Sequence, residues 1–184
     1  EAKQLADRGD ARAQAIVAMH YQLGWQTEKD ESLAGRYAQA SAEAGHPLGI
    51  YRLGNLMVSG INGQKDPQTG YKLQAASIQG IANLGNPNGD ADPYAQTAHG
   101  IMMFQGKVCP QDKVTAVKAY HHAAVQGLAP AMFNYIMAEI EGQGVPKNQQ
   151  ALIDFIGLWD KTLEPGGCPL DSGGMQGRDC ASCR

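Results

Sequence analysis

The sequence is poor in aromatic residues and has no apolar run long enough to cross a membrane. Phe, Trp and Tyr make up 7% of its 184 residues, so Ala, Leu, Ile and Met must carry most of the packing. No stretch approaches the roughly 18 consecutive apolar residues of a transmembrane helix. A signal peptide is also missing, because the first residues resemble the end of a helical unit. We therefore expect no membrane span, and either a processed or truncated start or a segment upstream of this sequence.

Positive charge and catalytic motifs are equally scarce. The chain has 15 Lys and Arg against 18 Asp and Glu, a net charge of −3, and a pI near 5.9. No basic stripe is present, which argues against nucleic acid as a partner. The G-x-S-x-G, phosphate-loop and H-E-x-x-H motifs are absent. We therefore expect a protein that is not an enzyme and that uses no cofactor.

A pattern of glycines and helix-capping residues recurs along the chain. Four glycines are separated by 36, 46 and 36 residues, namely Gly24, Gly60, Gly106 and Gly142. Six residues after each glycine stands an Asp or Asn, a type of residue that caps the start of a helix. These capping residues are Asp30, Asp66, Asp112 and Asn148. Such a register indicates structural repeats.

Each repeat has the composition of two short helices joined by a loop. Glycine accepts the left-handed backbone that ends the first helix, and small residues let paired helices approach closely. The chain is predicted to be all-α, with four helix pairs stacked into a solenoid, and residues 1–8 are predicted to end an earlier helix. The predicted units are 10–45, 45–80, 93–127 and 127–163. The first helices are predicted at 11–23, 48–59, 93–105 and 129–141, and the second at 31–44, 67–79, 113–126 and 149–163.

Two segments fall outside the regular units of this solenoid, which spans 1–164. The stretch 81–92, IANLGNPNGDAD, accounts for the longer interval and is rich in turn-forming residues. It is predicted to be an inserted loop. Residues 165–184 are rich in Gly and Cys and show no helical period. They are predicted to form a separate C-terminal tail.

The fourth unit carries the fullest version of the pattern, at Ala129, Ala131, Phe133, Gly142, Gly144, Val145 and Asn148. This arrangement resembles the Sel-one-like repeats (SLRs), which are shorter relatives of tetratricopeptide repeats. The resemblance covers about residues 5–163, with four units in register. It implies a right-handed superhelix that acts as an adaptor, and many such proteins are bacterial and secreted or periplasmic. We therefore expect a periplasmic or secreted location.

The cysteines gather in the tail, at Cys168, Cys180 and Cys183, while Cys109 lies in the loop of the third unit. An even number suits two disulfides in an oxidising compartment, with three possible connectivities. Zinc and free thiols are the alternatives. Cys180-x-x-Cys183 has the spacing of zinc ligands, but the second pair of a zinc signature is absent. We predict disulfides and no metal site.

Stacked helix pairs leave a concave groove lined by the first helix of each unit. Apolar positions flanked by polar ones suit a peptide, and methionine makes an adaptable surface. The alternative is that these methionines belong to the core between helices. The predicted groove residues are Met19, His20, Arg52, Asn55, Leu56, Ile101, Met102, Gln105, Asn134, Met137 and Glu141.

The predicted function is a non-catalytic scaffold that binds a partner protein or peptide in this groove. The alternative is a module that binds cell-wall glycan or regulates a lytic enzyme. Additional aromatic residues on the groove would favour the glycan, because sugar rings stack on aromatic side chains. A third possibility is an enzyme or metal sensor that uses the cysteine tail.

Overall fold

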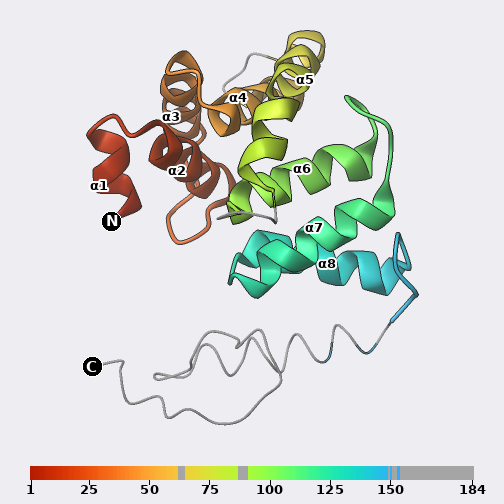
Figure 1. The fold of residues 1–184 in the computed structure, drawn as a ribbon. Helices are drawn as coiled ribbons and strands as arrows, with labels where there is room; N and C mark the ends of the chain where they lie inside the picture. The colour runs from red at the N-terminus through yellow and green to blue at the C-terminus, as the bar shows by residue number, and fades with distance from the viewer. Residues whose placement is uncertain (62–64, 87–90, 149, 151–152, 154–184) are drawn as a thin grey trace, which may run out of the picture.

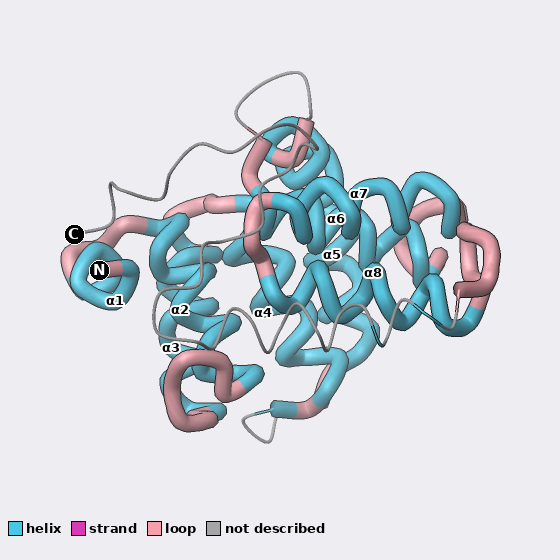
Figure 2. Tube along the Cα trace, turned by 90° about the horizontal axis from the view of Figure 1, so that it is seen from below, coloured by secondary structure: helices cyan, strands magenta, loops and turns pink. Residues whose placement is uncertain are grey.

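The computed structural model describes residues 1–61, 65–86, 91–148, 150 and 153. These residues form helices and connecting loops, and no strand occurs among them, as predicted for an all-α chain (Figure 2). The helices are α1 (Ala2–Asp7), α2 (Ala11–Leu23), α3 (Glu31–Glu43), α4 (Pro47–Ser59), α5 (Pro67–Leu84), α6 (Pro93–Gln105), α7 (Lys113–Val125) and α8 (Ala129–Glu141). We call α2, α4, α6 and α8 the A helices, and α3, α5 and α7 the B helices.

The structure confirms the residues predicted to begin and end the helices. All four A helices end on a glycine with a left-handed backbone, with φ between 66° at Gly106 and 78° at Gly60. The B helices begin at aspartates whose side chains accept hydrogen bonds from backbone amides three residues later. Except in α5, the helix bounds agree with the sequence to within one residue. The predicted helix at 149–163 and the tail at 165–184 lie outside the described residues.

The helices pack in chain order into an extended stack (Figure 1). Each helix packs against the next one along the chain, and each A helix also packs against the following A helix. The buried apolar residues accordingly form several clusters along the stack. One cluster lies between α1 and α2. Two clusters contain residues from the helices between α2 and α6, and two contain residues from α6, α7 and α8. A core distributed along the stack is the arrangement expected of a solenoid, which has no single central core.

Paired helices cross at positions that have little or no side chain. A Cβ atom on Gly54 of α4 would lie 2.7 Å from the carbonyl oxygen of Gly70 in α5. A Cβ on Gly70 would lie 2.6 Å from the carbonyl oxygen of Gly54. The same position of the repeat in α6 is Gly100, where a Cβ would lie 2.7 Å from the ring of Tyr120. Glycine therefore sets the distance between the helices in these two pairs.

The prediction that residues 81–92 form a loop is wrong for its first part. Helix α5 continues through Gly80 to Leu84 and ends at Gly85. Ile81 is fully buried in the central cluster, with Leu84 packed against it, and this burial stabilises the extra turn. Gly80 is needed for close packing, because a Cβ there would lie 2.4 Å from Pro47.

We expect Gly70→Ala to destabilise the protein by about 1–3 kcal/mol, because its new methyl group has no space against α4. At an exposed helix position the same change would add roughly 0.5–1 kcal/mol of stability. Urea unfolding followed by circular dichroism measures the difference. Lys72→Ala, at an exposed position of the same helix, is the control and should change stability by less than about 0.5 kcal/mol. A Gly70→Ala protein as stable as the parent would contradict the proposed crossing.

Candidate functional site

A groove of about 720 Å³ runs across all four A helices. Its lining shifts from the C-terminal half of α2 to the N-terminal half of α8, so it crosses the helices diagonally. This drift follows from the small rotation between successive units of a solenoid. The lining residues are Met19, Gln22, Leu23, Trp25, Tyr51, Arg52, Asn55, Thr97, Ile101, Gln105, Ala129, Pro130, Phe133 and Asn134.

Large apolar side chains are exposed on this groove. Phe133 has 59% of its surface exposed and Leu23 has 55%, and both line the groove. Monomeric proteins generally keep such side chains from gathering on one surface unless it binds something. Asn55, Gln105 and Asn134 place amide groups among them. The groove therefore combines apolar contact area with groups that donate and accept hydrogen bonds.

Trp25 closes one side of the groove. It lies in the loop after α2, yet its side chain packs against the cluster that Leu128 and Ala131 form with α7. The first unit therefore reaches the fourth across the concave face. The ring of His20 meets the Trp25 ring edge-on, with 4.8 Å between the ring centroids. This contact holds the loop over the end of α2.

Arg52 is the one charged side chain among the described residues of the lining, and it lies at the bottom of the groove with 8% of its surface exposed. Its Nη2 donates a hydrogen bond to the sulfur of Met19 at 2.9 Å, and its guanidinium lies 5.5 Å from the centre of the Tyr51 ring. It forms no ion pair within the described part of the chain. Burial lowers the pKa of the Arg52 guanidinium, which nonetheless keeps its charge, because arginine does not deprotonate in proteins.

Two further polar atoms close to Arg52 are buried without a hydrogen-bond partner among the described residues. They are the hydroxyl of Tyr51 and Nε2 of His20. Burial raises the pKa of Tyr51, and the Arg52 charge and the Asn55 amide act in the opposite direction. Burial lowers the pKa of His20, and Arg52 lowers it further. The described residues therefore leave part of the hydrogen-bonding capacity near Arg52 unused.

The predicted groove residues divide into three groups in the structure. Leu56 and Met102 are 3% and 1% exposed and lie in the core. The prediction that they line the groove is corrected, because this position of an A helix faces the preceding unit. His20, Met137 and Glu141 lie on A helices outside the lining. The lining contains the other six, namely Met19, Arg52, Asn55, Ile101, Gln105 and Asn134.

Three aromatic lining residues were missed by the sequence analysis. Tyr51 and Phe133 occupy the fifth position of their A helices, where the repeat pattern assigns an aromatic residue to packing. Tyr51 lines the groove although it is buried, whereas Phe133 is exposed. Trp25 follows Gly24 directly, outside the helix. Its contact with the fourth unit depends on superhelical curvature, which the local pattern does not encode.

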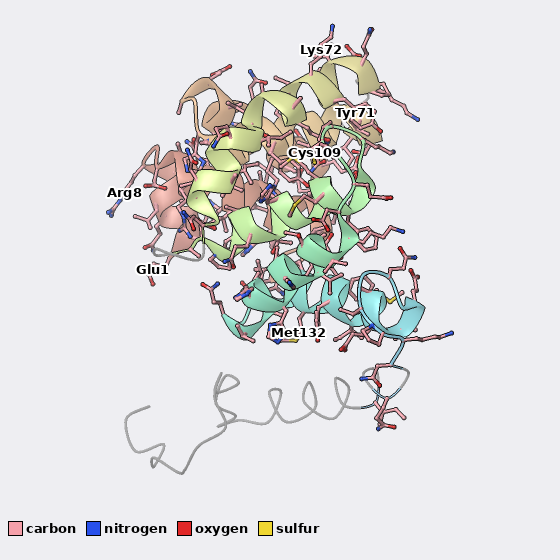
Figure 3. The ribbon with its side chains drawn as sticks, turned by 45° about the vertical axis from the view of Figure 1, so that its right-hand side comes forward. Glu1, Arg8, Tyr71, Lys72, Cys109 and Met132 are labelled. Carbon is pink, nitrogen blue, oxygen red and sulfur yellow. The ribbon has the colours of Figure 1, made fainter. Side chains whose placement is uncertain are left out.

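Cys109 lies in the loop after α6, partly buried against the central cluster (Figure 3). Its thiol is free within the described part of the chain, and burial raises its pKa. Cys168, Cys180 and Cys183 lie outside the described residues, and so does the predicted pairing of the tail. No three His, Cys, Asp or Glu residues among those described are arranged to hold a metal ion. None of the described helices is both long and apolar enough to span a membrane.

Paired helices, glycine stops and a groove along the A helices define an α/α repeat solenoid related to tetratricopeptide repeats. The model of the Sel1 repeat matches residues 11–46, 47–73, 93–127 and 129–151. The chain therefore belongs to the Sel1 repeat family, as the resemblance predicted. Proteins of this family are generally scaffolds for protein interactions.

Two solved structures are similar to this chain. One is a Sel1 repeat protein from Oxalobacter formigenes, with 21% identity and a TM-score of 0.46, covering 80% of this chain and 57% of that protein. The other is a protective antigen of uropathogenic Escherichia coli that displays an SLR fold, with 26% identity and a TM-score of 0.42. That match covers 86% of this chain and 33% of the antigen. This chain thus matches less than two thirds of either protein. Comparison with curated proteins gave no match.

Acidification should destabilise the fold before the aspartates are protonated. Burial lowers the pKa of His20, His46 and His99, whereas a histidine in the unfolded chain has a pKa of about 6.5. As the pH falls through that value, the unfolded chain takes up protons that the folded chain does not, so the free energy of unfolding decreases. The lowered pKa values of Asp66 and Asp112 act at a lower pH.

The urea midpoint measured at about pH 7.5 and about pH 5 tests this expectation. It should be lower at the acidic pH, and His99→Gln should reduce the difference between the two values. His121→Gln, at an exposed position of α7, is the control. A midpoint that stays constant or rises on acidification would contradict the expectation.

Proposed function

We propose that this protein is a non-catalytic adaptor that binds a segment of a partner polypeptide in the groove across the A helices. The observation that carries the proposal is the exposure of Phe133 and Leu23 on a concave, largely apolar surface. Burying such side chains against a partner gives roughly 1.5–3 kcal/mol each. The proposed contact residues include Ile101, Gln105 and Asn134.

The composition of the groove supports binding rather than chemistry. Among the described residues that line it there is no Asp, Glu, His, Cys or Lys, so they supply none of the usual general acids, bases and thiol or amine nucleophiles. The amides of Gln105 and Asn134 suit the backbone of an extended peptide, which has a donor and an acceptor at each residue. The proposed setting is periplasmic or secreted, as for many bacterial proteins built from these repeats.

A glycan is the second candidate ligand. Trp25, Tyr51 and Phe133 all line the groove, which is a larger aromatic surface than the sequence predicted. Aromatic rings offer flat apolar faces with specific contact geometry, and these suit sugar rings. The peptide remains the first proposal, because Tyr51 is buried and Trp25 is packed against the fourth unit. These contacts leave Phe133 as the exposed ring of the three.

The full chain should select peptides from a displayed random library, and Phe133→Ala should weaken the best binder about tenfold or more. Phe133 belongs to none of the described core clusters, so the variant should keep its fold. Fluorescence anisotropy with the synthetic peptide measures the affinity. Val114→Ala is the matched control, because Val114 is 52% exposed on the B helix α7. It should leave the affinity unchanged.

A parallel titration with a hexamer of N-acetylglucosamine separates the two ligands. If no peptide is selected and the sugar binds in a manner that depends on Phe133, the glycan replaces the peptide. Peptide binding that is equally sensitive to Val114→Ala and Phe133→Ala would show that the groove is not the binding surface.

A further inference from the structure

The buried charge of Arg52 has no counterpart in the described part of the chain. The acidic residue whose charge reaches it is Asp92. That carboxylate is already engaged, because it pairs with Arg12 and accepts hydrogen bonds from the amides of Tyr94 and Ala95 at the start of α6. A guanidinium has five N–H donors. The hydrogen bond seen for Arg52 goes to the sulfur of Met19, which is a weak acceptor.

The architecture of the repeat does not require a cation at this position. The residues equivalent to Arg52 in the other A helices are Ile16, Ala98 and Asn134. Ile16 and Ala98 are buried, so the stack accommodates an apolar side chain there. A buried charge without a partner is costly, and an anion that reaches it would remove that cost. The geometry of the groove therefore points to a ligand with a negative charge.

The position of Arg52 in the middle of the groove indicates what part of a ligand would lie next to the negative charge. Arg52 lies on α4, between α2 and α6, and the lining continues on both sides of it. Leu23 lies on the α2 side, and Ile101 and Phe133 lie on the α6 and α8 side. A chain end placed at Arg52 would leave half of the groove unfilled. A continuous segment that passes over Arg52 would fill both halves.

We propose that Arg52 receives the side-chain carboxylate of an Asp or Glu within an internal segment of the partner polypeptide, with large apolar residues on both sides of it. This inference rests on the proposed function of the groove and specifies its ligand. Arginine and carboxylate form paired, charge-assisted hydrogen bonds. The buried Tyr51 hydroxyl, which lies beside the Asn55 amide, adds a neutral donor.

The test uses a library of acetylated and amidated nonapeptides that lack terminal charges. The central residue is Glu in one half and Gln in the other, and the flanking positions carry Leu, Ile, Met or Phe. The full chain should bind members of the Glu half. For the tightest binder, Glu→Gln in the peptide or Arg52→Met in the protein should each weaken binding about 30-fold or more. Both changes together should cost little more than either alone, because each removes the same interaction.

Three results would overturn the inference and leave groove binding intact. The first is equal binding of the Glu and Gln peptides, with both sensitive to Phe133→Ala. The second is tighter binding of a peptide whose free C-terminal carboxylate replaces the central Glu. The third is self-association of the protein, seen by sedimentation and lost in Arg52→Met, which would make a second copy the occupant. Absence of binding in both halves would overturn the proposed function as well.

The stability of the free protein provides an independent measurement. If Arg52 serves a ligand, Arg52→Met should unfold at the same temperature as the parent or higher, because methionine removes a buried unpaired charge. Arg52→Lys, which keeps the charge but loses the planar pair of donors, should retain part of the preference for Glu. A lower unfolding temperature for Arg52→Met, with equal losses for the Glu and Gln peptides, would assign Arg52 a structural role and overturn the inference.

Discussion

The close approach of paired helices is the constraint on which this structure depends. At the α4–α5 crossing the backbones of Gly54 and Gly70 meet with no room for a Cβ atom. The pair made by α6 and α7 meets at Gly100 in the same register. Because the two helices of a unit lie close together, successive units stack with their A helices in contact. The A helices therefore lie along one surface. The groove exists because this surface curves as the units rotate.

The curvature of the stack also explains why some parts of the fold and the site could be predicted from the sequence and others could not. Glycine stops and aspartate caps act within a few residues, so the helix bounds followed from the repeat register. Helix α5 departed from that register because Ile81 gains burial in a cluster formed by other helices. The contact of Trp25 with the fourth unit, and the burial of Leu56 and Met102, likewise depend on how units rotate against one another. No short pattern in the sequence encodes that rotation.

Arg12, which is about half exposed, and Arg52, which is buried at the bottom of the groove, have different neighbours. Arg12 pairs with Asp92, which also caps α6, and the interaction ties α2 to the start of the third unit. Arg52 is more deeply buried and has a methionine sulfur and an aromatic ring as its neighbours. The chain as a whole has a net charge of −3, yet the one charge on the described lining of the groove is positive. Recognition of an acidic, apolar segment is consistent with this contrast.

Hydrogen exchange of the full chain with and without a bound peptide tests most directly whether the stacked A helices form one binding surface. The account predicts that the peptide slows exchange in four separate stretches, at 19–25, 51–55, 97–105 and 129–134. Protection in all four at once would follow from one ligand lying across α2, α4, α6 and α8. Protection confined to α3, α5 and α7, with the A helices unchanged, would contradict it.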